Sequence, residues 1–145
     1  MRKFLCFLLI IALLIGIFPP IVFAAPVTNY TDLAAAIAAA PTDGTLTTIE
    51  LGGNFSATGG AISIASGQNI VLTSAAGNIF TFTQATAGQR HFTVAGSLTL
   101  QNVTLSGPGG TTFGGGVNVS GGSLTIAGGA TITNCNVSGS GGAAS

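Results

Sequence analysis

The chain has 145 residues; 47% are hydrophobic, only 4% are charged, and the net charge at pH 7 is zero. Three basic residues are too few for the positive surface that nucleic acids or anionic membranes attract, so both classes of partner are excluded. From Phe92 onward, Cys135 carries the only ionisable side chain.

The N-terminal end has the layout of a secretory signal peptide. A positive Met1–Lys3 stretch precedes an apolar run over Phe4–Ile17, Pro19-Pro20 then breaks any helix, and small residues lead up to Ala24. We therefore expect residues 1–24 to be removed and the mature protein to be secreted or held at the cell surface. A membrane anchor is the alternative, because the apolar sequence is nearly long enough to span a bilayer. No later apolar run is long enough for a stable span.

A helix is predicted over residues 31–40, within an N-terminal segment that covers residues 25–45. Alanine, the best helix former, dominates this stretch. Thr31 is the expected N-cap, Asp32 suits the positive end of the helix dipole, and Pro41 ends the helix. One apolar face is shared by Leu33, Ala36, Ile37 and Ala40. A short helix with such a face is suited to capping the open end of a repeat structure.

Short apolar-x-apolar units recur from residue 46 onward. Alternation with a period of two predicts strands with one buried face, and the Gly, Asn and Ser residues between the units predict tight turns. The units are Ile49–Leu51, Ile62–Ile64, Ile70–Leu72, Phe80–Phe82, Phe92–Val94, Leu98–Leu100, Val103–Leu105, Val117–Val119 and Leu124–Ile126. Two or three such strands in each period of the repeat indicate a solenoid.

Matches at longer range predict how the coils stack. Residues 92–100 match residues 117–126, which would place the second run one coil beyond the first. Earlier units step from Leu51 to Leu72 and on to Val94 at a slightly shorter, nearly constant interval. These steps predict that the units at Ile70–Leu72, Phe92–Val94 and Val117–Val119 are neighbouring parallel strands on one side of the coil.

A second match joins residues 100–107 to residues 132–139, and it aligns Asn102 with Asn134. This asparagine alignment places Cys135 one coil beyond Val103, and it makes the two asparagines a stacked pair in a turn. Extended further, it ends the chain within a turn, just before a strand is due. We therefore expect the chain to be an N-terminal fragment of a longer protein.

The runs Gly114–Val119, Gly121–Ile126 and Ala130–Cys135 resemble successive sides of one coil in the right-handed parallel β-helix family, the pectate-lyase-like fold of many bacterial surface proteins. The resemblance covers residues 46–145. It implies an all-β fold, a parallel β-helix solenoid with a short N-terminal capping helix, whose coils are truncated at the C-terminus. Periodicity does not determine the handedness of the solenoid.

No catalytic, cofactor-binding or metal site is predicted, and the chain is not expected to be an enzyme. Glycoside hydrolysis needs two positioned carboxylates, and a calcium site needs several oxygen ligands. Asp32 lies on the expected helix, Asp43 in the turn that follows and Glu50 in the first strand, and no Asp or Glu occurs after Glu50. These three carboxylates imply no cofactor.

Three other features have both a functional and a structural interpretation. The Arg90-His91 pair is interpreted as a solvated turn before a strand rather than as a sugar-contacting pair, because a lone histidine has no partner base, nucleophile or metal ligand. Cys135 is interpreted as a small, buried apolar side chain rather than as a thiol that links chains. Glycan acceptor triplets, which also arise by chance in such a composition, begin at Asn29, Asn54, Asn102, Asn118 and Asn136.

Together these features favour a secreted or cell-surface β-helix stalk of an adhesin-like protein, with a structural and binding role and an unidentified cell-surface glycan or protein as ligand. The alternative is the N-terminal part of a polysaccharide lyase or hydrolase whose catalytic residues lie downstream. Ice binding by ranked threonines is a third, disfavoured hypothesis. In the expected register Thr81, Thr83, Thr131 and Thr133 do not recur at one fixed coil position.

Overall fold

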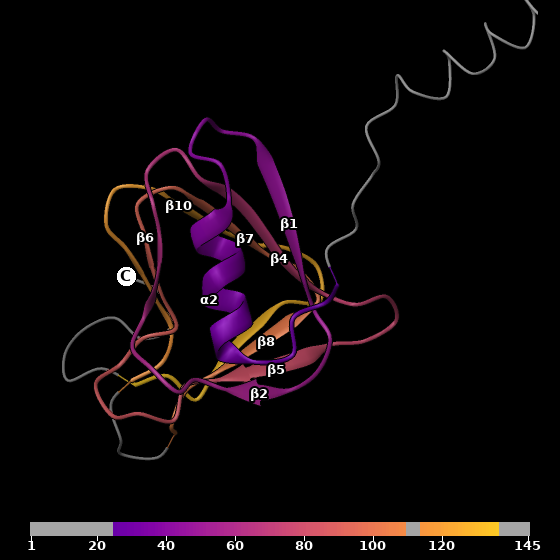
Figure 1. The fold of residues 1–145 in the computed structure, drawn as a ribbon. Helices are drawn as coiled ribbons and strands as arrows, with labels where there is room; N and C mark the ends of the chain where they lie inside the picture. Colours follow the sequence, from indigo (N-terminus) through magenta and orange to yellow (C-terminus); the bar gives the residue numbers. More distant parts are fainter. Residues whose placement is uncertain (1–24, 110–113, 137–145) are drawn as a thin grey trace, which may run out of the picture.

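The computed structural model describes residues 25–109 and 114–136, so the expected signal peptide (1–24) and the last expected coil residues (137–145) lie outside the described residues. The described chain is a parallel β-solenoid preceded by one helix (Figure 1). The predicted fold class is therefore confirmed. The elements are α2 (Tyr30–Ala39), β1 (Leu46–Leu51), β2 (Phe55–Ser56), β3 (Ile62–Ile64), β4 (Asn69–Ser74), β5 (Phe80–Thr83), β6 (Phe92–Val94), β7 (Ser97–Leu100), β8 (Val103–Ser106), β9 (Val117–Val119), β10 (Ser123–Ile126) and β11 (Thr131–Thr133).

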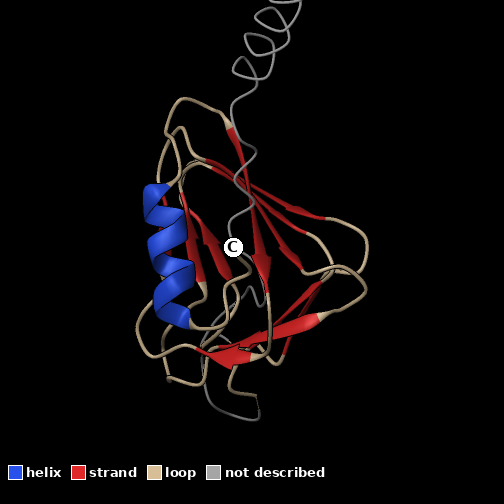
Figure 2. Cartoon of the chain, turned by 45° about the vertical axis from the view of Figure 1, so that its right-hand side comes forward, coloured by secondary structure: helices blue, strands red, loops and turns tan. Residues whose placement is uncertain are grey.

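Three parallel sheets form the sides of the solenoid (Figure 2). Their strand orders are β1-β4-β7-β10, β2-β5-β8-β11 and β3-β6-β9. Each coil contributes one strand to each sheet, which gives three complete coils and two strands of a fourth within the described residues. All nine predicted apolar units lie in strands, while β2 and β11 were not among them.

The sequence predicted that Ile70–Leu72, Phe92–Val94 and Val117–Val119 are neighbouring strands on one side of the coil. This prediction is wrong for Ile70–Leu72. Phe92–Val94 does pair with Val117–Val119, but its other neighbour is Ile62–Ile64. Leu72 instead pairs with Ile49 on one side and with Leu100 on the other. Each coil holds three strands of nearly identical pattern, so the predicted steps connected strands that belong to different sides.

The expected asparagine alignment near the end of the chain is also wrong. Thr131 pairs with Thr104 and Ile132 pairs with Leu105, a shorter step than the one that joins Asn102 to Asn134. Asn102 therefore precedes β8 whereas Asn134 follows β11, and the two asparagines lie at different corners. Both have a left-handed backbone, with φ values of 50° and 55°, which asparagine tolerates better than most residues. The matching turn chemistry at two corners produced the false alignment.

The core is a stack of inward-pointing side chains from successive coils. Phe82, Leu105 and Leu100 are fully buried. Phe82 lies at the centre of an aromatic cluster, with its ring centroid 5.1 Å from that of Phe55 and 5.9 Å from that of Phe92. Burial of such stacks is the main stabilising term, because each coil alone has too little apolar area to form a core.

Helix α2 lies across the ring of strands at the N-terminal end of the stack (Figure 1). Its buried residues are Leu33 and Ile37, as the apolar face predicted. The N-cap is Asn29 rather than Thr31, because the Asn29 Oδ1 atom accepts a hydrogen bond of 2.9 Å from the Asp32 N–H. The helix ends at Ala39, where the approach to Pro41 holds the next residue in an extended conformation.

A buried glutamine joins this helix to the solenoid. The Gln68 side-chain amide donates hydrogen bonds of 2.7 Å and 3.0 Å to the carbonyls of Ile37 and Ala40, and its oxygen accepts one from the Ala65 N–H. The last carbonyls of a helix lack the usual partner within the helix. Gln68 therefore supplies a partner to the Ala40 carbonyl and a second one to the Ile37 carbonyl, which also accepts from the Ala40 N–H. No helix among the described residues is long and apolar enough to cross a membrane.

Candidate functional site

The carboxylates lie on three different elements. Asp32 occupies the first turn of α2, where its Oδ2 atom accepts a hydrogen bond of 2.7 Å from the Asn29 side chain. Asp43 lies in the turn before β1, and hydrogen bonds from the Thr45 side chain and backbone hold its pKa below the usual value. Glu50 is exposed on β1. Within residues 25–109 and 114–136, no three His, Cys, Asp or Glu side chains come together to hold a metal ion.

His91 is not in a solvated turn, so the interpretation of this residue is wrong. Its side chain is fully buried, and its ring packs edge-on against Phe82 with the centroids 5.0 Å apart. The Nε2 atom lies 3.1 Å from the Phe82 carbonyl oxygen, which can only accept, so Nε2 carries the proton and donates. Burial lowers the pKa of His91 to about 4, against the weaker effect of the surrounding carbonyls of Phe82, Gly116 and Ser106. The ring is therefore neutral near pH 7.

A second buried glutamine connects the residues around His91. The Gln84 side-chain nitrogen donates hydrogen bonds to the carbonyls of Gly59 and Arg90, at 3.3 Å and 3.1 Å, and its oxygen accepts one from the Thr86 N–H. Arg90 is partly buried, and its Nη1 atom has no hydrogen-bond partner in the described part of the chain. Gln84 thus serves the same purpose at this corner as Gln68 does beneath the helix.

Cys135 lies at the same corner, two coils further along, and not in the interior rank of Val103. Its thiol is partly buried and donates to the Thr133 carbonyl at 3.1 Å. Burial raises the pKa of this thiol, while the backbone of Gly107 and Gly116 and the charge of Arg90 act in the opposite direction. The cysteine therefore occupies an inward corner position, with low reactivity, at the edge of the core.

Glycine is required beside this thiol. Gly115 has a φ of 77°, and a Cβ atom at Gly115 would lie 2.7 Å from the Cys135 Sγ atom and 2.6 Å from the Gly107 Cα atom. The corner around His91 and Cys135 is therefore closely packed. Its imidazole is neutral and its thiol is protonated near pH 7, so these residues are suited to holding successive coils together.

Two asparagines of glycan acceptor triplets use their side chains within the fold. Asn29 caps α2, and the Asn54 Oδ1 atom accepts a hydrogen bond of 2.8 Å from the Thr81 N–H of the next coil. These contacts give both residues a structural role that sequence analysis did not assign. Gln68 and Gln84 were missed as well, because glutamine is ordinarily exposed and nothing in its spacing marks a buried position.

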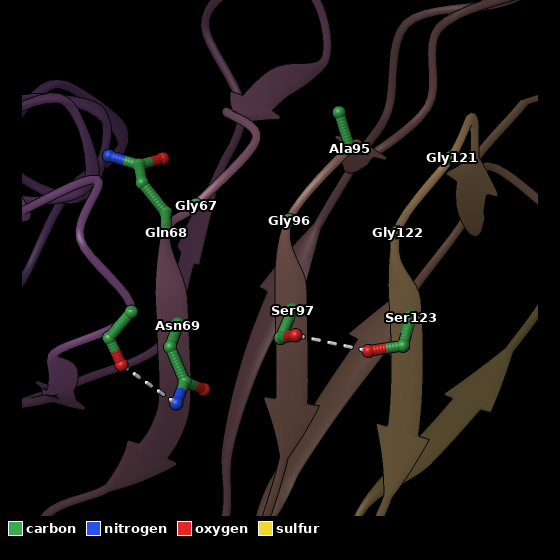
Figure 3. Close-up of a pocket in the computed structure, with 10 residues that line it drawn as sticks. Gly67, Gln68, Asn69, Ala95, Gly96, Ser97, Gly121, Gly122 and Ser123 are labelled. Atoms are coloured by element: carbon green, nitrogen blue, oxygen red, sulfur yellow. Dashed lines mark hydrogen bonds between the residues drawn. The ribbon is translucent and has the colours of Figure 1, made fainter.

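A shallow groove runs along the corner that leads into the β1-β4-β7-β10 sheet (Figure 3). It has a volume of about 340 Å³. Its polar side chains form a rank across three coils, in which Asn69 pairs with Ser97 and Ser97 with Ser123. The Ser123 hydroxyl donates to the Ser97 hydroxyl at 3.1 Å. A side chain at Gly96 or Gly122 would collide with main-chain carbonyls of the preceding coil, so close stacking explains these two glycines.

Another regular array covers the outer face of the β2-β5-β8-β11 sheet. Thr81, Thr104 and Thr131 are aligned by strand pairing in one rank. A second rank, two residues further along each strand, comprises Ser56, Thr83, Ser106 and Thr133. Threonines therefore do recur at fixed coil positions, contrary to the sequence-based expectation, because Thr131 stacks on Thr104 and the asparagine alignment does not hold.

Comparison of the chain with protein-family models, curated proteins and solved structures finds no match.

Proposed function

We propose that the chain is a secreted or cell-surface β-solenoid with a structural and binding role, comparable to the stalk of an adhesin. One observation carries the binding part: the rank of Asn69, Ser97 and Ser123 along the corner groove, which places a polar side chain at the same point of three successive coils. Stacked coils lie about 4.8 Å apart, so the rank offers regularly spaced donors and acceptors along the axis.

The ligand that best suits this groove is a neutral, hydroxyl-rich chain such as an oligosaccharide. The groove lining contains no charged residue, and amide and hydroxyl groups both donate and accept hydrogen bonds. The alternative, the N-terminal part of a polysaccharide lyase or hydrolase, places its catalytic residues downstream. Asp32, Asp43 and Glu50 lie on three separate elements and do not form such a site themselves.

Calorimetric titration of the purified chain with neutral manno-, xylo- and cello-oligosaccharides tests this proposal. Ser97→Leu fills the middle of the groove and should abolish binding, whereas the control Ser63→Leu, on the exposed face of β3, should leave it unchanged. Absence of binding to every oligosaccharide, or equal loss in both variants, would count against a glycan site in the groove.

A further inference from the structure

We propose that the outer face of the β2-β5-β8-β11 sheet binds the surface of ice. This hydroxyl face is defined by Ser56, Thr81, Thr83, Thr104, Ser106, Thr131 and Thr133. It lies on a different side of the solenoid from the corner groove, so the inference is independent of the function proposed above.

The positions of these side chains form a two-dimensional lattice. Along the solenoid axis, Thr81, Thr104 and Thr131 follow one another at the spacing of paired strands, about 4.8 Å. Along each strand the two ranks are two residues apart, about 6.6 Å in a parallel strand. A crystal of ice is itself a lattice of water oxygens with repeats of this size, so one rigid set of hydroxyls and methyls can meet many lattice positions together.

The lattice is held rigid from within. Between the two ranks, each strand turns one side chain inward, and those of Phe82 and Leu105 are completely buried. The branched Cβ of threonine restricts χ1, so the methyl and hydroxyl groups vary little in direction. Binding to an extended solid surface rewards such preorganisation, because little conformational entropy is lost on contact.

The hydroxyls of the face are available to water. No group in residues 25–109 or 114–136 forms a hydrogen bond with the hydroxyl of Thr81, Thr83, Thr104, Thr131 or Thr133. Ser106 is the exception, because its hydroxyl lies 3.4 Å from the Gly107 carbonyl and 3.3 Å from the Asn134 side-chain nitrogen. Thr131 is exposed and the other four threonines are partly exposed.

The chemistry of the face favours ice over a polysaccharide or protein partner. Strands β5, β8 and β11 contain no charged side chain, which would hold its own hydration shell and disturb an ordered water layer. Their aromatic residues, Phe80 and Phe82, alternate with the outward threonines, so neither belongs to the hydroxyl ranks on which a sugar would have to stack. Hydroxyl and methyl groups in a fixed array remain, and both are compatible with ordered water.

The neighbouring β1-β4-β7-β10 sheet provides an internal contrast. Its comparable rank runs Thr48, Val71, Thr99 and Thr125, so a valine interrupts the hydroxyls. Leu46 is 59% exposed and Glu50 is charged and exposed on the same strand. Thr99 and Thr104 therefore lie on the same coil, in central strands and with similar partial exposure, but on faces of different regularity.

The test measures ice growth in the presence of the purified full chain, by thermal hysteresis and by inhibition of ice recrystallisation. Thr104→Lys places a charged side chain at the centre of the hydroxyl face, and Thr99→Lys is the matched control. We expect Thr104→Lys to raise the protein concentration needed to stop recrystallisation by about tenfold or more, equivalent to the loss of one strong contact. Thr99→Lys should behave as the unmodified chain does. Circular dichroism confirms that each variant is folded.

Adsorption of the fluorescently labelled, unmodified chain to a single ice crystal supplies a measurement that needs no variant. Uniform or plane-specific labelling of the crystal supports the proposal, and exclusion of the protein into the surrounding liquid overturns it. Equal losses with Thr99→Lys and Thr104→Lys would also overturn it, as would binding of the face to insoluble cellulose or chitin without any effect on ice. If Thr104→Lys does not fold, Thr83→Lys in the second rank replaces it, with the same expected loss.

Discussion

The third coil, which begins with β7, and the fourth coil, which begins with β10, carry the same pattern of side chains but bury them to very different extents. Ile49, Leu72, Leu100 and Ile126 form one inward rank of the first sheet. Leu72 and Leu100 are fully buried, whereas Ile126 is 52% exposed. Both faces of the inner coils are covered by neighbours, while no described strand pairs with β10 on its far side. Burial in this fold is therefore set by stacking between coils more than by the pattern within one coil.

The opposite end of the same rank shows the effect of covering a terminal coil with a helix. Ile49 belongs to the first coil, yet it is only 6% exposed. Helix α2 contacts β1 and β3 and buries its own Leu33 and Ile37 against the coil. A short amphipathic helix thus covers the first coil as a neighbouring coil would. This is why the first and fourth coils differ in burial although their strands have similar sequences.

The largest effect on stability is expected from truncating side chains of this inward rank, one at a covered position and one at an uncovered position. Leu100→Ala should lower the free energy of unfolding by about 2–5 kcal/mol, because it leaves a cavity among packed neighbours. Ile126→Ala should cost less than about 1 kcal/mol, because water already reaches that side chain. Urea unfolding followed by circular dichroism measures both values.

Each variant is the control for the other, since both remove branched aliphatic side chains from paired positions of adjacent strands. Equal losses of stability would mean that Ile126 is covered as completely as Leu100, and the contrast between the two coils would not hold.

A smaller effect is expected from pH, through the buried His91. Its folded-state pKa of about 4 lies below the unfolded value of 6.5, so the neutral ring stabilises the fold above pH 6.5 and this stability is lost as the pH falls toward 4. From the two pKa values the loss is about 2 kcal/mol at pH 5 and about 3 kcal/mol at pH 4. Urea unfolding at pH 7.5, 6 and 5 measures this loss of stability. These pH values lie above the range in which carboxylates titrate, so the effect of His91 can be separated from theirs.

His91→Gln is the control, because glutamine does not titrate and its side-chain nitrogen can still donate to the Phe82 carbonyl. We expect this variant to lose most of the pH dependence between pH 7.5 and pH 5. An unchanged dependence would show that His91 is accessible to water and does not belong with the covered inner coils.

Sequence analysis predicted the strands well because each has a strong local signal. In β7 and β8, for example, apolar and polar residues alternate over the whole strand. The helix face was equally clear, since Leu33 and Ile37 are the only large aliphatic residues in an alanine-rich stretch. The cap was misplaced because Asn29 and Thr31 are both good N-cap residues and lie only two positions apart.

The stacking of the coils was harder to predict, because three strands of similar pattern in every coil offer several plausible alignments. The false match of Asn102 with Asn134 arose from two corners that need the same left-handed conformation. The burial of His91 had no sequence signal, because the corner that encloses it is completed by Ser106 and Gly116 from later parts of the chain. The candidate surfaces depend on that stacking, so neither the groove rank nor the threonine ranks could be read from the sequence.

The most direct test is a disulfide cross-link that distinguishes the two alignments of the last coil. In a Cys135→Ser background, Thr104→Cys is combined either with Thr131→Cys, its partner in the structure, or with Asn136→Cys, its partner in the asparagine alignment. Paired strands place the Cα atoms about 4.8 Å apart, within the range a disulfide spans. We predict rapid cross-linking under mild oxidation for Thr104→Cys with Thr131→Cys and none for the other pair. Cross-linking of Thr104→Cys with Asn136→Cys instead would contradict the register on which the hydroxyl face depends.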